Sequence, residues 1–266
     1  MKKKYRIIDA HTHIFPEKIA SKAVSAIGDF YGLDMQRDGM SLDLIKSGDK
    51  IGVEKFLVCS TATRPEQVQT INDFIFEQCK KHSDKFIGFG TLHPFMKEPE
   101  KEIERIAEFG FKGIKFHPDF QKFNIDDEKA VEMYKLLQEK YFILMHTGDD
   151  RYDYSKPKRL AKVCDKLPDM KVIAAHFGGY LCWDEVLDVY NHNNIFIDTS
   201  SSLFTLDHER ALKIIERVSA KNVFFGVDYP MWDHEEELER FMALPLDEKT
   251  REDILYNNFC REFNLK

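Results

Sequence analysis

Two histidines near the start of the chain, His11 and His13, are separated by a single residue. They follow a short, largely apolar run at residues 5–8. If this run continues as a β-strand, Asp9, His11 and His13 project from the same side, because side chains alternate along a strand. Neutral imidazole is a common ligand of divalent metal ions. The spacing therefore predicts half of a metal site, which other segments of the chain must complete.

Further polar residues stand at the ends of later apolar runs that have the composition of strands. In chain order they are Lys115, His117, His146, His176 and Asp228. Lys115 and His117 share one side of their run by the same alternation. These residues are far apart in the sequence, so they can form one site only if the fold brings the ends of their strands together.

Eight short β-rich runs alternate with amphipathic helical patterns. The runs are expected at residues 5–10, 55–59, 86–91, 113–116, 142–145, 171–175, 195–198 and 222–227. No Gly-rich phosphate-binding turn follows the first run, which disfavours a doubly wound open sheet, and no linker is visible. The sequence predicts an α/β protein with a single (β/α)₈ (TIM) barrel domain over residues 1–266.

In such a barrel the carboxyl ends of the strands converge on one mouth, where active sites are built. Three imidazoles and one carboxylate suit Zn²⁺ and leave room for a water molecule. Bound zinc lowers the pKa of that water to about 7, which provides hydroxide at neutral pH. A further histidine beside the metal could transfer protons or polarise the substrate.

Several of these residues also have simpler interpretations. Asp228 precedes Tyr229 and Pro230, and could form only a turn at the strand end. His117 precedes a proline, which by itself predicts an extended turn. Arg64 is a candidate anion clamp or a solvated loop residue. Four histidines in helical or loop patterns are expected to be solvated: His82, His192, His208 and His234.

As an ordered set, the motifs around the histidines and Asp228 resemble the amidohydrolase superfamily. More narrowly, they resemble its amidohydrolase-related (amidohydrolase 2) branch, which includes 2-amino-3-carboxymuconate-6-semialdehyde decarboxylase. The likeness extends from the first strand to the last helix. It is carried by His11-Thr12-His13 after Ile8-Asp9-Ala10, His146 after Ile143-Leu144-Met145, Ala175-His176-Phe177-Gly178-Gly179 and Gly226-Val227-Asp228-Tyr229-Pro230.

The resemblance implies roles for the residues at the strand ends. The metal would be bound by His11, His13, His146 and Asp228. His176 would be the catalytic acid or base beside the metal, and Asp228 would also accept a proton. With this four-ligand set in place, we expect Asp9 one layer deeper in the barrel, where it orients a ligand rather than binding the metal.

Lys115 is open to two interpretations. Many hydrolases of the superfamily carry a carboxylated lysine on the fourth strand that bridges two metal ions. An unmodified lysine would instead offer a positive charge to a substrate carboxylate. We favour the unmodified form and one ion, most simply Zn²⁺. Lys115, His117 and Arg64 are then the expected substrate-binding residues.

The leading expectation for function is a metal-dependent hydrolase that acts on a small amide, lactone or ester through a metal-activated water. The alternative is a metal-dependent, non-oxidative decarboxylase, or carboxy-lyase, of a small carboxylate-bearing substrate. A third class, a non-catalytic metal-binding barrel, is disfavoured because His176 and Asp228 supply acid–base groups.

Composition narrows the partners and the location. The formal net charge of −7 disfavours nucleic-acid binding. No apolar run approaches the length of a membrane span. The five cysteines are scattered and odd in number, which indicates a reduced, cytoplasmic protein. A small-molecule substrate is expected, and the family resemblance suggests a homodimer.

Overall fold

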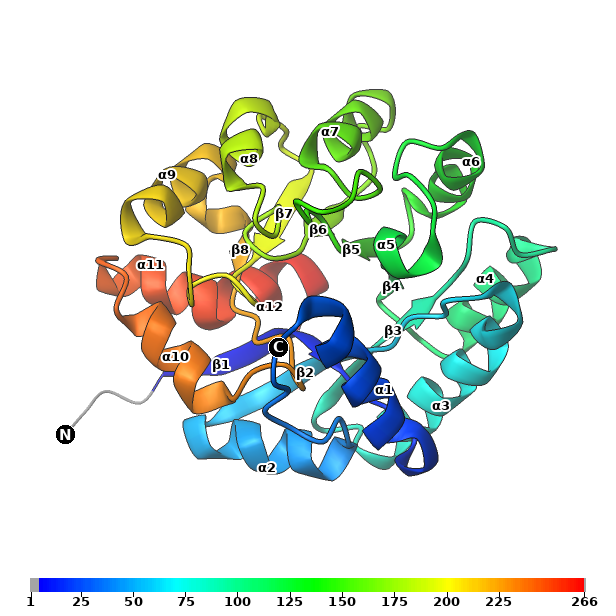
Figure 1. Ribbon diagram of the computed structural model, residues 1–266. Helices are drawn as coiled ribbons and strands as arrows, with labels where there is room; N and C mark the ends of the chain where they lie inside the picture. The colour runs from blue at the N-terminus through cyan, green and yellow to red at the C-terminus, as the bar shows by residue number, and fades with distance from the viewer. Residues whose placement is uncertain (1–4, 266) are drawn as a thin grey trace.

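The computed structural model describes residues 5–265, so residues 1–4 and 266 of the predicted domain lie outside the described part. Within it, eight parallel strands follow one another around a barrel in chain order (Figure 1). They are β1 (Ile7–His13), β2 (Val53–Cys59), β3 (Phe86–Thr91), β4 (Gly113–Phe116), β5 (Phe142–Met145), β6 (Val172–Ala174), β7 (Ile195–Asp198) and β8 (Val223–Phe224). The predicted TIM barrel is confirmed.

The barrel closes between the first strand and the segment that follows the last. The Ala10 backbone N–H donates to the Phe225 carbonyl over 2.8 Å. Further along, the Asp228 N–H donates to the His11 carbonyl over 2.8 Å. These bonds place Asp228 beside the two histidines of β1, although more than two hundred residues separate them in the chain.

Helices and short helical turns surround the strands and cover the two ends of the barrel. They are α1 (Glu17–Tyr31), α2 (Ser41–Ile51), η1 (Pro65–Gln67), α3 (Val68–Lys81), α4 (Pro99–Glu108), α5 (Pro118–Gln121), α6 (Glu128–Leu137), α7 (Pro157–Lys166), α8 (Trp183–Val189), α9 (His208–Val218), η2 (Ala220–Asn222), α10 (His234–Met242), α11 (Glu248–Glu252), η3 (Asp253–Asn257) and α12 (Asn258–Phe263). None of the helices within residues 5–265 is both long and apolar enough to cross a membrane.

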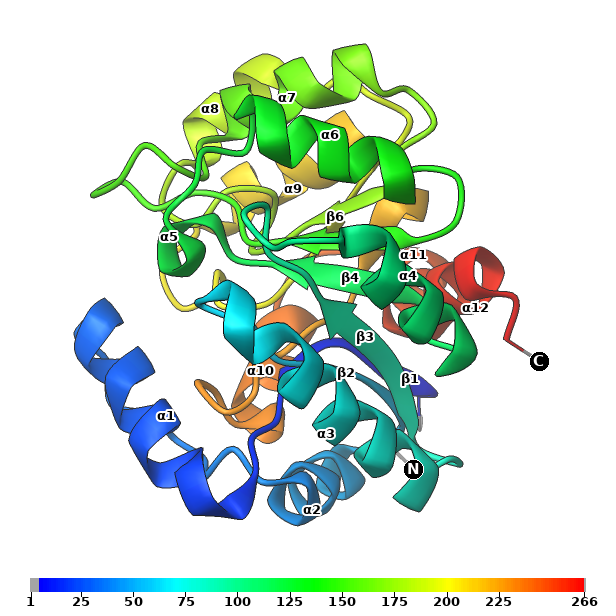
Figure 2. The same ribbon diagram turned by 90° about the vertical axis from the view of Figure 1, so that its right-hand side faces the viewer.

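The two ends of the barrel have different coverings. At the amino-terminal end of the strands, Phe259 and Phe263 of α12 pack against the apolar interior that includes Phe142. At the carboxyl-terminal end, α1 lies across the mouth, on the opposite side of the molecule from α12 (Figure 2). The interior is therefore closed by an apolar plug at one end and remains available for chemistry at the other.

Asp9 does not project with His11 and His13, as simple alternation predicts. Ile8 and Ala10 belong to the apolar interior of the barrel, so Asp9 points outward to α10. The register of β1 is irregular between Asp9 and Thr12, which turns the later residues relative to Asp9. Asp9 accepts a hydrogen bond from the His11 backbone N–H over 3.0 Å. It therefore supports the chain that carries the histidines.

His234 is the partner of Asp9, and the expectation that it is solvated is wrong. Its side chain is fully buried, with Nε2 3.0 Å from Asp9 Oδ2 and Nδ1 2.8 Å from Ser47 Oγ. Burial raises the pKa of Asp9, and the interaction with His234 opposes that shift. The pair connects β1 to α10 and α2 beneath the mouth of the barrel.

We expect His234→Ala to lower the free energy of unfolding by about 3 kcal/mol, because it leaves the buried Asp9 without its side-chain partner. The loss stays near the lower end of the range for such pairs because Asp9 keeps two backbone N–H donors, of His11 and Val227. Urea unfolding measures it. His208→Ala, at an exposed position, is the control and should change the stability by less than about 0.5 kcal/mol. If His234→Ala lowers the free energy of unfolding as little as the control does, His234 does not stabilise the buried Asp9 as we infer.

Candidate metal centre and active site

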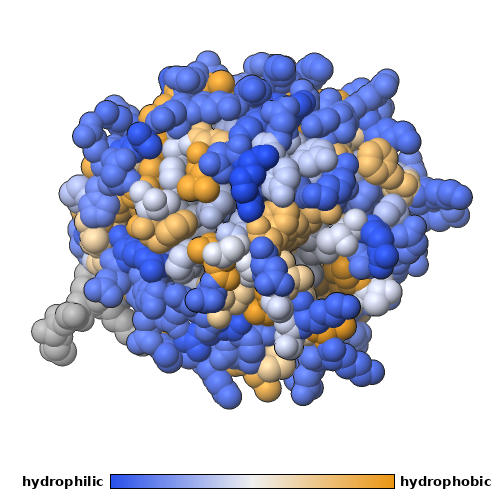
Figure 3. Space-filling view, viewed as in Figure 1, coloured by the Kyte–Doolittle hydropathy of each residue, from blue (hydrophilic) through white to orange (hydrophobic). Residues whose placement is uncertain are grey.

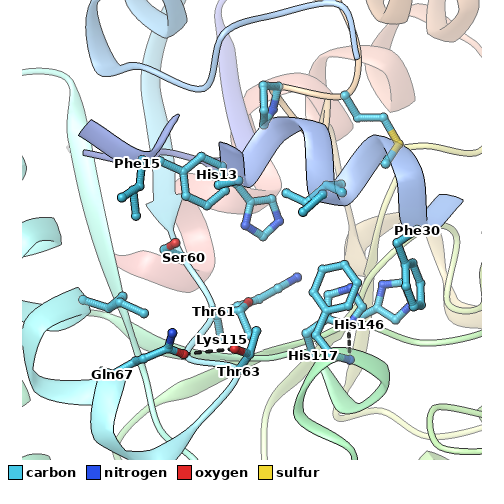
Figure 4. Close-up of a pocket in the computed structure, with 18 of the residues that line it drawn as sticks. His13, Phe15, Phe30, Ser60, Thr61, Thr63, Gln67, Lys115, His117 and His146 are labelled. Carbon is cyan, nitrogen blue, oxygen red and sulfur yellow. Dashed lines mark hydrogen bonds between the residues drawn. The ribbon is translucent and has the colours of Figure 1, made fainter. Parts of the chain in front are cut away.

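The polar strand ends meet at the wall of a cavity of about 480 Å³ at the barrel mouth (Figure 4). Of the residues predicted from the sequence, this wall contains His13, Lys115, His117, His146, His176 and Asp228. His11 lies directly behind it, with Nε2 3.1 Å from His13 Nε2. Arg64 is exposed and is not among the lining residues, so the structure does not bring it to the site.

His11, His13 and Asp228 form a compact set of donor atoms. Asp228 Oδ1 lies 3.6 Å from His11 Nε2 and 3.4 Å from His13 Nε2. These atoms are close enough together to bind one metal ion. His146 is not part of this compact set; its Nδ1 lies 3.0 Å from Nε2 of His176 instead.

Hydrogen bonds behind the two β1 histidines determine which nitrogen of each ring carries the proton. His11 Nδ1 lies 2.9 Å from a carboxylate oxygen of Asp198, which can only accept, so Nδ1 is the protonated nitrogen. The Cys59 thiol donates to the Thr12 carbonyl over 3.4 Å. Its sulfur is therefore the acceptor for His13 Nδ1, 3.6 Å away. His11 therefore turns an unprotonated Nε2 toward Nε2 of His13, the nitrogen at which the His13 ring can bind either a second proton or a metal ion.

The other two histidines are oriented in the same way. His146 Nε2 donates to the Gly148 carbonyl over 3.1 Å, which leaves Nδ1 unprotonated. The Ser200 hydroxyl donates to Asp198, so its oxygen is the acceptor for His176 Nδ1, 2.9 Å away. Nε2 of His176 is then unprotonated and faces Nδ1 of His146.

Two pairs of ring nitrogens thus face each other at about hydrogen-bond distance. Each pair is stable only with a positive charge between or beside the two nitrogens, a proton or a metal ion. A divalent cation held by imidazole and carboxylate ligands meets this requirement, because neutral imidazole is its usual nitrogen ligand. The residues present therefore fit a bound metal ion.

The electrostatics of the buried groups are consistent with this donor set. Burial, reinforced by the nearby ammonium of Lys115, lowers the pKa of His11 to about 4. Burial also lowers the pKa of His176. For Asp228 burial acts in the opposite direction, but the surrounding histidines, led by His11, hold its pKa well below the ordinary value. At neutral pH, His11 and His176 are neutral and Asp228 is ionised.

His13 is the place in this set where a positive charge is most stable. Burial lowers its pKa, but Cys59 and Asp228 outweigh that effect and raise the pKa to about 9. A proton at Nε2 and a metal ion at the same nitrogen respond to the same field. The position beside His13 and Asp228 therefore favours a cation.

Lys115 is fully buried beside the metal set, with Nζ 3.0 Å from the unprotonated Nε2 of His11. Burial lowers its pKa, while Cys59, Asp228 and Asp198 act in the opposite direction. The amine faces the cavity and is close to the candidate ligands. It is therefore a basic group within reach of an anion that binds beside the candidate ligands.

His117 lies one layer away from the metal set. Its ring stacks between those of Phe120 and His146, with centroids 3.8 and 3.9 Å away. Its Nδ1 accepts from the Phe120 backbone N–H, so Nε2 carries the proton and faces the Tyr31 hydroxyl at 3.1 Å. His117 thus joins the cavity floor to α1.

The sequence reasoning missed several residues that support the site. Asp198 ends the seventh strand and Ser200 follows it, and the strand-end rule that identified the histidines could have identified Asp198 too. Cys59 ends the second strand in the same way. Tyr31 lies on a helix outside the barrel, and no pattern in the sequence pointed to it.

A family model described as Amidohydrolase matches residues 8–261. A search of curated protein sequences gave no match. Among solved structures, an uncharacterized TIM-barrel protein from Bordetella bronchiseptica is 18% identical, with a TM-score of 0.80 over 98% of this chain and 99% of that chain.

Two other structural neighbours have a named activity. A 5-carboxyvanillate decarboxylase from Sphingomonas paucimobilis is 15% identical, with a TM-score of 0.76 over 98% of this chain and 99% of that chain. A dihydroxybenzoic acid decarboxylase from Polaromonas sp. JS666, with bound manganese and the inhibitor 2-nitroresorcinol, is 16% identical, with a TM-score of 0.74 over 98% and 97%.

These neighbours correct the leading expectation for the reaction. The sequence favoured hydrolysis of a small amide, lactone or ester, whereas these two neighbours are decarboxylases. The error has a physical reason, because hydrolysis and decarboxylation can use the same metal ligands. Residues at the strand ends therefore could not separate the two reactions. The choice of zinc is likewise not supported over another divalent ion, since the Polaromonas enzyme binds manganese.

We expect Asp198→Ala to weaken Mn²⁺ binding by about 10–100-fold, because His11 and Ser200 lose the acceptor that orients them. Titration calorimetry of the metal-free protein measures the affinity, and circular dichroism checks the fold. Asp169→Ala, at an exposed position, is the matched control and should bind Mn²⁺ as the unaltered protein does. Equal affinities for Asp198→Ala and its control would show that the hydrogen bonds behind the histidines do not prepare the site.

Proposed function

The chain belongs to the amidohydrolase family, and we propose that it is a metal-dependent decarboxylase of a small carboxylic acid. The observation that carries the proposal is Lys115, a buried lysine that faces the cavity 3.0 Å from a candidate metal ligand. A buried ammonium beside a cation site is suited to a substrate that is itself an anion. The decarboxylases among the structural neighbours support the same reaction class.

His11, His13 and Asp228 would hold the metal, with His146 as the fourth ligand. A bound divalent ion supplies positive charge that polarises a substrate oxygen. Zn²⁺ and Mn²⁺ are both compatible with imidazole and carboxylate ligands. We expect one ion rather than two, because the amine of Lys115 occupies the space beside His11.

Lys115 would bind the substrate carboxylate. The amine lies at the inner end of the cavity and is screened from water by its complete burial. In such surroundings a charge-assisted hydrogen bond between ammonium and carboxylate is stronger than one in water. The substrate is therefore anchored with its carboxylate toward the histidines.

His176 would deliver the proton that replaces CO₂, after its Nε2, unprotonated in the free site, has taken up a proton from water. In the reaction the bond between the carboxylate and its carbon breaks, its electron pair stays on that carbon, and a proton adds there. His176 Nε2 faces the site, and its Nδ1 is connected through Ser200 to the Asp198 carboxylate, which stabilises the ring when it is protonated. Asp228 cannot be this acid, because its low pKa keeps it ionised at neutral pH.

The reaction is tested by incubating the Mn²⁺-loaded protein with 2,6-dihydroxybenzoate, with 5-carboxyvanillate and with a panel of lactones and amides. We expect CO₂ release from a carboxylate and no hydrolysis. Lactone or amide hydrolysis without CO₂ release would contradict the proposal.

Two histidine variants separate binding from catalysis. His11→Ala should lose the metal, whereas His176→Ala should keep it and lower kcat by at least about 100-fold, the usual loss for a removed general acid. His208→Ala is the control and should change neither. Metal content and turnover are measured on the same samples. If His176→Ala also empties the site, the assigned roles are wrong.

Lys115→Met removes the charge with little change in volume. We expect kcat/KM to fall by about 10–100-fold, the range for loss of a hydrogen bond to a charged group. The bound metal should be retained. Lys122→Met is the matched control, since Lys122 also lines the cavity but packs over the rings of Tyr152 and Tyr154. Equal losses in the two variants would show that Lys115 has no special role.

A further inference from the structure

The cavity has a polar inner end and an apolar outer wall, and most of that wall comes from α1. The residues of α1 that line it recur at helical spacing, so one face of the helix points into the cavity. They are Ile19, Ala23, Ala26, Ile27, Phe30 and Tyr31. Ile71 and Phe74 of α3 add to the apolar lining. Figure 3 shows apolar side chains gathered around the mouth on this face of the molecule.

The wall is fixed at the carboxyl-terminal end of α1. The Tyr31 hydroxyl lies 3.1 Å from Nε2 of His117 on the cavity floor. Arg151 donates to the Phe30 carbonyl over 2.6 Å and is itself paired with Asp149. A ligand that reaches the histidines must therefore lie between the apolar face of α1 and the barrel.

Basic groups are scarce in this cavity. Among the described residues that line it, the basic side chains besides histidine are Lys115 at the inner end and Lys122. Lys122 Nζ lies over aromatic rings, 5.3 Å from the Tyr152 centroid and 5.9 Å from that of Phe30. Among the described lining residues other than histidine, Lys122 beside Phe30 is thus the one basic group near α1, and burying an unpaired charge against the rest of that wall would be costly.

The volume exceeds what a simple aromatic acid needs. A cavity of about 150 Å³ is enough to hold a benzene ring, whereas this one measures about 480 Å³. The residues of α1 that line the cavity are apolar apart from the Tyr31 hydroxyl. A substrate that fills the cavity therefore carries an apolar group several carbons long.

We propose that the substrate is an amphipathic monocarboxylate, an aromatic acid with an extended apolar substituent. Its carboxylate lies at Lys115 and the histidines, and its substituent packs against Ala23, Ala26 and Ile27 of α1. The chemistry at the carboxylate rests on the proposed function. The apolar subsite rests on the lining of the cavity.

Binding of benzoate, 4-ethylbenzoate, 4-butylbenzoate and 4-hexylbenzoate to the Mn²⁺-loaded protein tests the subsite by titration calorimetry. Each buried methylene group should tighten binding by up to about fourfold, the equivalent of about 0.8 kcal/mol. A gain below about 1.5-fold per methylene group across the series would overturn the inference.

Ala26 is exposed in the free protein but faces the cavity, so Ala26→Asp places a carboxylate where the hexyl group would cover it. It should weaken binding of 4-hexylbenzoate by at least about 30-fold, with benzoate changed by less than threefold. Ser25→Asp introduces the same charge one residue away, at an exposed position outside the cavity lining, and should change neither. Ala23→Phe fills the cavity without adding charge and should also weaken only the longer acids. Equal binding of 4-hexylbenzoate by Ala23→Phe and the unaltered protein would contradict the placement of the subsite.

The proposal and the proposed function fail in different ways. Turnover of small aromatic acids, with no dependence of affinity on chain length, would refute the apolar subsite and leave the decarboxylase standing. Affinity that rises with chain length, with CO₂ released from none of the acids, would support the subsite and refute the decarboxylase.

Discussion

The site depends on one buried carboxylate, that of Asp198 at the end of β7. Its Oδ2 accepts from His11, and its Oδ1 accepts from the Ser200 hydroxyl and from the His176 backbone N–H. Burial raises the pKa of Asp198, but His11 and its other partners overcome this and bring the pKa to about 2. This ionised group therefore orients a candidate metal ligand and the candidate acid together. A change at Asp198 cannot alter one role without the other.

The residues that stabilise the barrel and those that could take part in chemistry lie at opposite ends of its axis. Below the mouth, the interior is filled by apolar side chains and closed by Phe259 and Phe263 of α12. Above them lies a buried polar layer in which almost every group has a hydrogen-bond partner, as the cost of burying polar atoms requires. The same strands run through both ends of the barrel. Packing of the apolar end therefore also fixes the strand ends that carry the polar layer. Closure between β1 and the segment after β8 is the step that completes the site.

The part of the site that the sequence could predict is the part carried by strand ends. His11, His13, His146, His176 and Asp228 were identified because parallel strands deliver their carboxyl ends to one mouth. Asp9 was misplaced at first, because a local irregularity in β1 cannot be read from alternation.

The roles of His234 and Tyr31 could not be predicted from the sequence, for a different reason. Their partners, Asp9 and His117, are set by the docking of helices, and the helical pattern of a segment does not indicate what it packs against. The cavity wall formed by α1 likewise depends on how that helix docks, so the sequence did not predict it. The sequence therefore indicated where the chemistry lies and left open the shape of the substrate.

The contrast between the polar floor and the apolar wall has a consequence for a reaction that consumes a charge. A carboxylate that enters this cavity loses its hydration, and among the lining basic groups Lys115 is the one at the inner end that can offset the loss. When CO₂ forms, the charge that Lys115 held is gone, and a neutral molecule has no comparable attraction to the floor. The remaining product is then held by apolar contacts along α1. The same wall that would select a substrate with an apolar group would also delay release of the decarboxylated product, so we infer that a long substituent improves binding more than it improves turnover.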